Sequence, residues 1–562
     1  MSPLVVAVVC LSSLALGYRF YSSWLADKLF RLRDDEPVPA VANEDGVDFV
    51  PTQCEVLWGH HFSSIAGAAP ILGPAMAIVW GWLPALVWIV FGVIFMGATH
   101  DFGALVLSVR HGGQTVGQLT EKFIGPRSRL LFQIVIFFLI WMVGAVFAFS
   151  IAKLFVGYPA SILPVNLELV AAVFIGWWGY RRKRSLLWPC VAALIGLYLV
   201  IFGTASGTLW VPSEGSLLRS VDFWLIFLMG YAYVASSLPV WLLLQPRDLI
   251  NSHQLVVGLG ALYLGFFLAG PEFHAPMVGE VANLPAIFPL LMVTIACGSI
   301  SGFHGLVSSG TTSKQLARAT HARPIGYGAM LGEAALATLA TMAVATGMMS
   351  DGVQHTFEYV HNAGGGVALP GVGDALRGFV EGAAGFLESL GLSRGIGQTV
   401  VAVLVISFAA TSLDTALRIQ RLILAEVGTT YRIRPLQNRW FGGLIACGSV
   451  LVLIYADKEA GGKSLWPVFG ATNQVLAAFT LLLCALYLRK LGRRAAAYAI
   501  PAVFVMGVTF AAMGIQVRRD FAAGSYLVAV VGAVIAVLTL WVAFEGGLAW
   551  RRTSAEVERA PR

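Results

Sequence analysis

Long apolar stretches recur along the whole chain, and short polar segments that hold most of the charged residues separate them. A helix needs about 20 apolar residues to cross a bilayer, and fifteen stretches reach or approach that length. The pattern predicts an all-α polytopic membrane protein with about 15 transmembrane helices. We place the spans at residues 4–24, 58–82, 84–109, 130–156, 165–180, 186–206, 222–245, 251–270, 285–309, 325–348, 397–420, 440–456, 465–488, 498–517 and 525–549.

The composition supports a membrane location. Of the 562 residues, 57% are hydrophobic and 12% are charged, whereas soluble domains carry about 25% charged residues. The net charge is +7, but the basic residues lie in short clusters between the apolar stretches, as membrane topology requires. We therefore expect the lipid bilayer as a partner and no binding of nucleic acid. The six cysteines show no CxxC spacing, which argues against a zinc ribbon.

The distribution of Lys and Arg predicts the orientation, because these residues gather on the cytoplasmic side of membrane proteins. With the N-terminus outside, 28 of the 37 basic residues fall in cytoplasmic segments and eight in external ones. The C-terminus is then cytoplasmic. The first span lacks the basic start and the small-residue cleavage site of a signal peptide, so we expect it to be retained.

The stretch 58–82 has the wrong composition for an unbroken helix. Four residues that disfavour helix fall near its centre: Gly67, Pro70, Gly73 and Pro74. Backbone groups freed at mid-membrane must be satisfied by protein, water or a solute, so irregular backbone there is tolerated only where it is buried or lines a cavity. The break therefore predicts a solute site.

A second interruption is predicted in the stretch 222–245, where Ser236, Ser237 and Pro239 lie near the middle. The two interrupted stretches run in opposite directions, and each opens a group of five spans. This pattern is typical of transporters built from inverted repeats, whose solute lies at the repeat interface. The predicted division is an N-terminal helix and linker, two repeats, and four C-terminal helices, at residues 1–57, 58–206, 222–426 and 440–562.

The longest external segment, 349–395, is too polar to span the membrane but contains an amphipathic stretch at 369–390. It is either a lid over the external mouth or a plain surface helix, and we favour the surface helix.

Ionisable groups inside spans are costly unless paired, which makes them candidates for ion or proton pathways. Asp101 follows His100 and either titrates with it or anchors the membrane surface. Glu333 has no basic residue within a turn of its own helix and is the preferred proton carrier. Asp414 and Arg418 are four residues apart, so a structural ion pair on one helix face competes with a mechanistic role.

Histidines and hydroxyls supply candidate solute contacts. His60 and His61 open the broken stretch, and His304 follows a further predicted break at the glycine- and serine-rich GSISGFHG. Zinc binding by these histidines is the weaker alternative to neutral histidines in a polar pocket, and we expect no metal site. The hydroxyl run LVSSGTTS at 306–313 either bonds back to its own helix or contacts a cation or the solute.

Motifs of soluble enzymes are absent from the sequence. Residues 457–464, DKEAGGKS, resemble a phosphate loop only at their last three positions, since Asp457 stands where the first glycine is required. HExxH and the nucleophile elbow do not occur. We expect neither an enzyme nor a bound cofactor.

Several motifs resemble the carbon starvation protein A family of bacterial transporters. They are DFVPTQCEVLWGHHFSSIAGAAPILGP (48–74), MGATHDFGALVLSVRHGGQTVGQL (96–119), GYAYVASSLPVWLLLQPRD (230–248), GSISGFHGLVSSGTTSKQL (298–316), SLDTALRIQR (412–421) and PVFGATNQVLAAFTLLL (467–483).

The resemblance implies peptide transport or proton-coupled pyruvate transport in the bacterial inner membrane, and a LeuT-type core of two inverted five-helix repeats. It would make 58–82, 222–245 and 285–309 the first, sixth and eighth core helices. A cation site between the first and eighth would pair the backbone near Phe62 to Gly67 with hydroxyls in the run at 306–313. The motif THDFG at 99–103 departs from the family pattern, in which we expect a glutamine before the aspartate.

We expect a secondary active transporter that takes up a small organic solute, pyruvate or a short peptide, with a proton favoured over sodium as the coupling cation. A channel or a membrane nutrient sensor is the alternative, and the oligomeric state stays open. The candidate solute contacts are His60, His61, Ser63, Ser64, Gly67, Ser236, Ser237, Ser301 and His304. The candidate ion-coupling residues are Asp101, Ser308, Ser309, Thr311, Thr312, Glu333 and Asp414.

Overall fold

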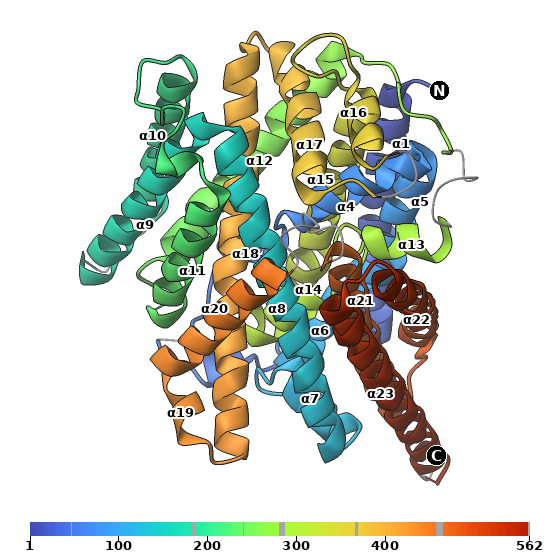
Figure 1. Ribbon diagram of the computed structural model, residues 1–562. Helices are drawn as coiled ribbons and strands as arrows, with labels where there is room; N and C mark the ends of the chain where they lie inside the picture. The colour runs from blue at the N-terminus through green and yellow to red at the C-terminus, as the bar shows by residue number, and fades with distance from the viewer. Residues whose placement is uncertain are drawn as a thin grey trace.

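The computed structural model describes residues 1–46, 48–182, 186–239, 241–279, 287–365, 369–456 and 465–559. Within these ranges the chain forms helices joined by turns and loops, and the only β-structure is two isolated bridges, which confirms the all-α class (Figure 1). The helices are α1 (Pro3–Leu16), α2 (Pro39–Ala42), α3 (Cys54–Ile65), α4 (Ala69–Ala77), α5 (Trp82–Gly92), α6 (Ala98–Val109), α7 (Val116–Phe123), α8 (Pro126–Gly157), α9 (Ile162–Arg182), α10 (Leu187–Ala205), α11 (Val221–Ser237), α12 (Leu244–Ala269), α13 (Ile287–Thr294), α14 (Gly302–Gly310), α15 (Ala329–Thr346), α16 (Thr356–Ala363), α17 (Val372–Glu388), α18 (Arg394–Thr430), α19 (Arg434–Gln437), α20 (Arg439–Ala456), α21 (Leu465–Lys490), α22 (Ala496–Ala522) and α23 (Tyr526–Arg559).

Eleven helices of the described chain are long and apolar enough to cross a membrane, and one bent pair, α3 with the helix after it, raises the number to 12. Shorter helical pieces occupy the remaining predicted spans, namely α11, the pair α13 and α14, and α20. The protein is therefore a multi-pass membrane protein. The count of 15 and the division into two repeats stay predictions.

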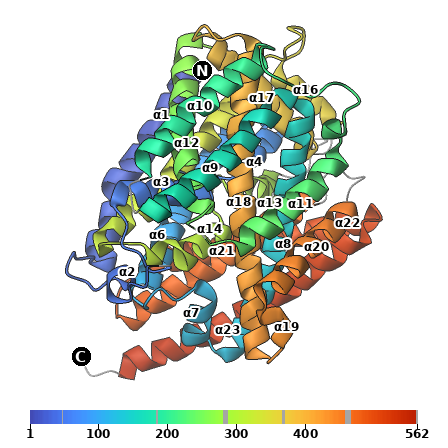
Figure 2. The ribbon, with the colours of Figure 1, turned by 90° about the vertical axis from the view of Figure 1, so that its left-hand side faces the viewer.

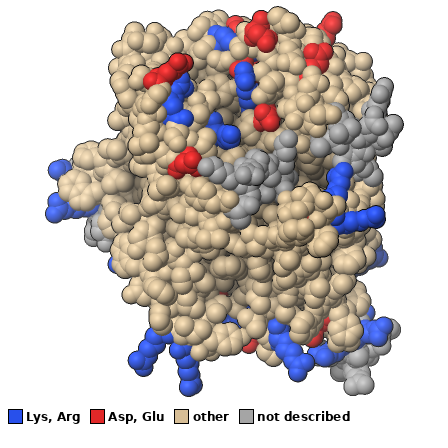
Figure 3. All heavy atoms as spheres, viewed as in Figure 1, with Lys and Arg blue, Asp and Glu red and all other residues tan. Residues whose placement is uncertain are grey.

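The long helices run between two ends of the molecule, and the chain termini lie at opposite ends (Figures 1 and 2). Helices α16 and α17 lie toward the end with the N-terminus, whereas α7 and α19 lie toward the end with the C-terminus. On the face drawn in Figure 3, most Asp and Glu lie nearer the end with the N-terminus, whereas Lys and Arg lie at both ends and at the sides. The predicted orientation, with a cytoplasmic C-terminus, stays a prediction.

Helix α3 is interrupted where the sequence predicts it. It ends at Ile65, the chain leaves helical geometry at Ala66, and the helical segment Ala69–Trp80 continues at an angle of 48°. Another interrupted segment packs against this one. Its interruption runs from Ile295 to Ser301, between α13 and α14. Because α3 packs against α14 and α4 against α13, the two interrupted segments run antiparallel.

The backbones at these breaks approach closely. A Cβ added to Gly73 would lie 2.7 Å from the carbonyl oxygen of Thr294, and one added to Gly97 would lie 2.2 Å from that of Ser299. Only glycine fits at such distances. The sequence predicted the counterpart of the first break in 222–245 and a further break at GSISG (298–302). The segment that faces the first break is Ile287–Gly310, which contains GSISG.

The predicted spans 222–245 and 251–270 leave residues 246–250 as a loop, and this prediction is wrong. Helix α11 ends at Ser237, where Leu238 is extended as expected for a residue before proline, and α12 begins at Leu244. Arg247 and Asp248 therefore lie within a helix, where they are 2% and 1% exposed. The chain reverses earlier than the hydropathy of LPVWLLLQP indicated.

The amphipathic stretch of the external segment forms α17, as predicted, but the surface-helix interpretation is wrong. Helix α17 packs against α4, α12, α15 and α18, and its Leu376, Phe379 and Val380 are fully buried. It therefore covers one end of the core.

Candidate functional site

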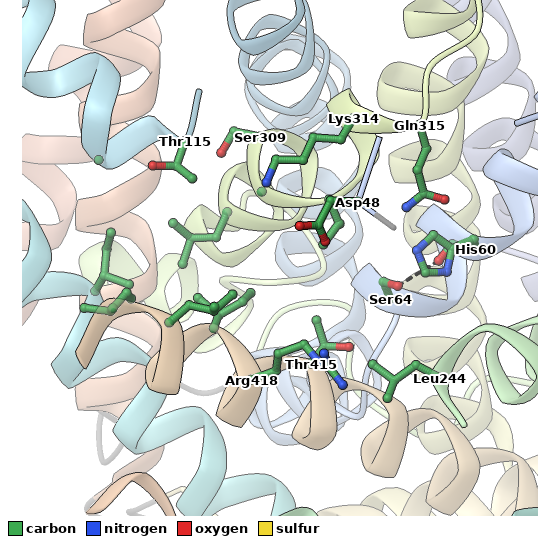
Figure 4. A pocket seen from close by; sticks show the side chains of 18 of the residues that line it. Asp48, His60, Ser64, Thr115, Leu244, Ser309, Lys314, Gln315, Thr415 and Arg418 are labelled. Carbon is green, nitrogen blue, oxygen red and sulfur yellow. Dashed lines mark hydrogen bonds between the residues drawn. The ribbon is translucent and has the colours of Figure 1, made fainter. Parts of the chain in front are cut away.

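A cavity of about 170 Å³ lies beside the first interrupted helix (Figure 4). Its walls come from α3, α7, α8, α12, α14, α18, the segment before α3 and the turn after α14. A second cavity of about 290 Å³ shares His60, Gln245 and Gln315 with it. Together they form a polar space next to the break.

The segment before α3 is joined to the turn after α14 at this cavity. The N–H of Val50 donates to the carbonyl of Lys314 at 3.2 Å, and the N–H of Thr52 donates to that of Gln315 at 3.0 Å. Thr52 and Leu316 form an isolated parallel bridge. Backbone bonds thus link the start of one interrupted segment to the end of the other.

Four predicted site residues line the cavity, namely His60, Ser64, Ser309 and Thr311. The Nδ1 atom of His60 lies 2.8 Å from Oδ2 of Asp248. The Ser64 hydroxyl donates to the carbonyl of His60 at 2.8 Å, an interaction drawn in Figure 4.

The charged residues Asp48, Lys314 and Arg418 also line the cavity (Figure 4), and sequence reasoning did not predict this role for them. Arg418 Nη2 donates to the carbonyls of Ala235 and Leu238, where α11 ends. The available signal for Lys314 was its position directly after the hydroxyl run. Asp248 and Glu426 line the cavity too, so its walls carry three acidic and two basic side chains.

Deeper in the core, four titratable side chains form a connected chain that we call the Asp101 cluster: His100, Asp101, His304 and Glu333. His100 Nδ1 lies 2.7 Å from Asp101 Oδ1, and His304 Nδ1 lies 2.9 Å from Asp101 Oδ2. His304 Nε2 lies 3.2 Å from Glu333 Oε2. All four side chains are fully buried. They come from α6, α14 and α15, which the sequence did not bring together.

The surroundings of the Asp101 cluster connect it to the interrupted helices. His304 lies beside the carbonyl of Ile65, the last residue of α3. Asn473 of α21 accepts from the N–H of Phe303 at 2.9 Å and donates to the hydroxyl of the predicted residue Ser301 at 3.0 Å. The start of α14 is therefore fixed on one side by α21 and reaches the end of α3 on the other.

A second buried group, which we call the Arg247 cluster, contains Arg247, Asp414, Tyr231, Glu168 and Ser407. Arg247 Nη1 donates to Oδ2 of Asp414 and, at 2.8 Å, to the Tyr231 hydroxyl. Tyr231 donates to Asp414 at 2.6 Å, and Ser407 donates to Glu168 at 2.8 Å. The predicted pairing of Asp414 with Arg418 is wrong, because the ion pair forms between helices, with Arg247 of α12.

The hydroxyl groups of the run at 306–313 differ in their hydrogen-bond partners. Ser309 and Thr311 donate to the carbonyls four residues earlier in their own helix. Thr312 Oγ1 instead lies 2.8 Å from His61 Nδ1, and the buried Ser308 hydroxyl has no hydrogen-bond partner among the described residues. Thr312 thus joins the turn after α14 to α3. The Ser308 hydroxyl is buried and free to bind a ligand.

The other predicted solute contacts lie away from the cavity lining. Ser63 donates to the carbonyl of His60, and Ser236 and Ser237 both donate to that of Tyr233 at the end of α11. Gly67 lies at the break, where an added Cβ would lie 2.7 Å from the Ser412 hydroxyl.

Groups of three or more His, Cys, Asp or Glu residues that could hold a metal ion do not occur in the described chain. His60 pairs with Asp248, His61 with Thr312 and His304 with two carboxyl groups. The phosphate-loop-like segment 457–464 lies outside the described residues.

Interrupted, antiparallel helices around a polar cavity define a multi-pass membrane protein built like a transporter. The family model "Carbon starvation protein CstA" matches residues 2–512. The chain belongs to this family.

Its relatives carry the names of transporters. It is 30% identical to "Peptide transporter CstA" of Helicobacter pylori (strain ATCC 700392 / 26695), over 90% of this chain and 80% of that protein. It is 31% identical to "Pyruvate/proton symporter BtsT" of Escherichia coli (strain K12), over 92% and 82%.

Two solved structures align with most of this chain. The "MhsT in complex with L-phenylalanine" structure aligns at a TM-score of 0.45 and 10% identity, over 87% of this chain and 99% of that one. An Eremococcus coleocola manganese transporter, in complex with an aromatic bis-isothiourea substituted compound, aligns at a TM-score of 0.41 and 14% identity, over 91% and 99%.

Proposed function

We propose that the protein is a secondary active transporter that takes up a small organic solute carrying a carboxylate, pyruvate or a short peptide, coupled to a cation. The observation that carries this proposal is the cavity among the helices beside α3: His60 and Ser64 line it, and Ser64 lies two residues before Ala66, where α3 leaves helical geometry. A volume of about 170 Å³ compares with a cavity of about 150 Å³ that holds benzene. The solute is therefore small.

The two basic side chains of the cavity support a carboxylate as one recognised group, and its three acidic side chains, which include Asp248 and Glu426, support a cationic group beside it. Lys314 and Arg418 both line it. Asp48 also lines it, and would suit the ammonium group of a peptide, which pyruvate lacks. The relatives' names include both solutes.

The packing of α17 supports alternating access, in which the cavity opens to one side at a time. Helix α17 covers the core at the end opposite α7 and α19, whereas the cavity reaches Thr115, Gly117 and Glu426 at the end where α7 lies. We propose that this arrangement is open toward the cytoplasm, in keeping with the charge bias of the sequence.

Solute and cation then favour the same closed state, so each raises the affinity for the other by the same factor. One place for a metal cation is the first break, where the buried Ser412 hydroxyl beside Gly67 has no hydrogen-bond partner among the described residues. A proton is the other candidate.

Uptake into proteoliposomes tests the function. Labelled pyruvate and labelled alanyl-alanine are offered under separately imposed proton and sodium gradients. We expect saturable accumulation of at least one solute above its equilibrium level under one gradient. Flux that does not saturate and is independent of both gradients would indicate a channel instead.

A matched pair of variants tests the cavity. Lys314→Gln removes a cation that lines it, so we expect KM for the transported carboxylate to rise about tenfold, equivalent to about 1.4 kcal/mol. Lys490→Gln removes an exposed lysine at the end of α21 and should leave KM unchanged. Equal KM values for the two variants would place the carboxylate elsewhere.

A further inference from the structure

The Asp101 cluster holds two carboxyl groups and two imidazoles in a fully enclosed space within the membrane. In the part of the chain that the structure describes, the hydrogen bonds and ion pairs of these four side chains involve no Lys or Arg. Two carboxylates without a cation are costly when both are ionised inside a membrane protein. The cluster is therefore built to hold at least one proton in addition to those of neutral imidazoles.

His304 is placed so that each ring nitrogen faces a different carboxyl group. Nδ1 is hydrogen-bonded to Asp101 at 2.9 Å, whereas Nε2 lies 3.2 Å from Oε2 of Glu333 without a hydrogen bond, so a small rotation of either side chain is needed to form one. A neutral imidazole has one N–H donor and one bare nitrogen that accepts. It can therefore donate to only one of these carboxylates, and the other carboxyl group fits the bare nitrogen only when it is protonated.

We propose that His304 relays the coupling proton between Glu333 and Asp101, which rests on the transport function proposed above. In the first arrangement, Nδ1–H donates to the Asp101 carboxylate while protonated Glu333 donates to Nε2. In the second, protonated Asp101 donates to Nδ1 while Nε2–H donates to the Glu333 carboxylate. When the first arrangement changes into the second, Glu333 gives its proton to Nε2 of His304, and Nδ1 of His304 gives its proton to Asp101. One O–H and one N–H bond break, one of each forms, and the net charge is unchanged.

The position of His304 ties this relay to the solute cavity. Leu306 and Ser309 line the cavity from the same short helix, two and five residues after His304. The carbonyl of Ile65 beside His304 follows Ser64, which also lines the cavity. A solute that shifts α3 relative to α14 therefore changes the surroundings of His304 directly.

Other groups around the relay belong to several elements. His100 of α6 contacts the other carboxyl oxygen of Asp101, Oδ1. Gly305 of α14 packs against the His100 ring, because a Cβ added to Gly305 would lie 3.1 Å from that ring. His61 of α3 interacts electrostatically with His304, and the thiol of Cys297 with Glu333. These groups can share or orient a proton, but only His304 lies between the two carboxyl groups.

Three variants in the full-length protein test the relay: Glu333→Gln, Asp101→Asn and His304→Gln. In proteoliposomes with pyruvate and alanyl-alanine as probes, proton influx is followed with an internal pH dye and solute exchange is measured at equal pH on both sides. We expect at least a tenfold fall in protons moved per solute, with exchange retained. Glu168→Gln, which changes a buried carboxyl group of the Arg247 cluster, should keep the wild-type ratio.

The outcomes separate the relay from the transport function. Wild-type vesicles that move neither probe would contradict the function itself. Wild-type transport driven by sodium alone, or a wild-type proton ratio in an exchange-competent Glu333→Gln or His304→Gln protein, would overturn the relay.

If the amide variants do not fold, Glu333→Asp keeps the carboxyl group but shortens the side chain. It should then shift the pH dependence of exchange relative to wild type. An unchanged pH dependence would contradict the relay.

Discussion

The Asp101 cluster and the Arg247 cluster are both enclosed among the helices, and both contain two carboxyl groups. In the Arg247 cluster a guanidinium, which stays charged at every physiological pH, lies against Asp414 and interacts electrostatically with Glu168. In the Asp101 cluster the corresponding place between two carboxyl groups is taken by the imidazole of His304.

The difference separates a fixed ion pair from a group that can change its protonation state. Arginine neutralises its neighbours permanently and links α12 to α18, so the Arg247 cluster stabilises one arrangement of helices. Histidine exchanges protons near neutral pH, so the Asp101 cluster can exist in more than one state. Buried charge alone therefore does not identify a coupling site, whereas the identity of the partner does.

The largest expected effect is the loss of the permanent cation. Arg247→Met should destabilise the protein by about 3–5 kcal/mol, because it leaves buried carboxylates without a partner. Thermal unfolding in detergent, followed by fluorescence or size-exclusion chromatography, measures the loss. The double variant Arg247→Met/Asp414→Leu should recover part of the stability, and a double variant less stable than Arg247→Met would contradict the ion pair.

A smaller effect is expected at the edge of the same cluster. Ser407→Ala removes the hydroxyl that donates to Glu168, which should cost about 2 kcal/mol, as for hydrogen bonds to charged groups. Proton-coupled uptake by the folded fraction should match wild type. A change in the proton-to-solute ratio would show that the Arg247 cluster also takes part in coupling.

The smallest effect on stability is expected at the relay. Glu333→Gln replaces a buried carboxyl group that has no cationic partner by a neutral amide, so the free energy of unfolding should change by less than about 1 kcal/mol, since such replacements are often neutral. The same variant should lose coupling. A loss of stability comparable with that of Arg247→Met would mean that Glu333 is ionised and paired, and the contrast between the clusters would fail.

Much of the helical pattern could be predicted from hydropathy, and the first break from its glycines and prolines. Glu333 and Asp101 were recognised as candidates because charge inside an apolar stretch is conspicuous on its own. Their joint contact with His304 could not be predicted, since it depends on how α6, α14 and α15 pack.

The wrong predictions share a cause. Each placed a residue or segment from its neighbours along the chain alone. Asp414 was paired with Arg418 four residues away, whereas its partner lies 167 residues away. Arg247 was assigned to a loop because proline and charge follow an apolar run, and helix α12 shows that these residues begin the next helix instead. The position of α17 likewise required knowledge of the helices beneath it.

The backbone bonds from Val50 to Lys314 and from Thr52 to Gln315 have a mechanical consequence. They tether the first interrupted segment to the second at the mouth of the cavity, so the two cannot separate there without breaking main-chain hydrogen bonds. Widening of the cavity there must then come from the other helices that line it, namely α7, α8, α12 and α18. Because the tether uses main-chain atoms, only proline, which lacks the donor, would remove it directly at positions 50 or 52.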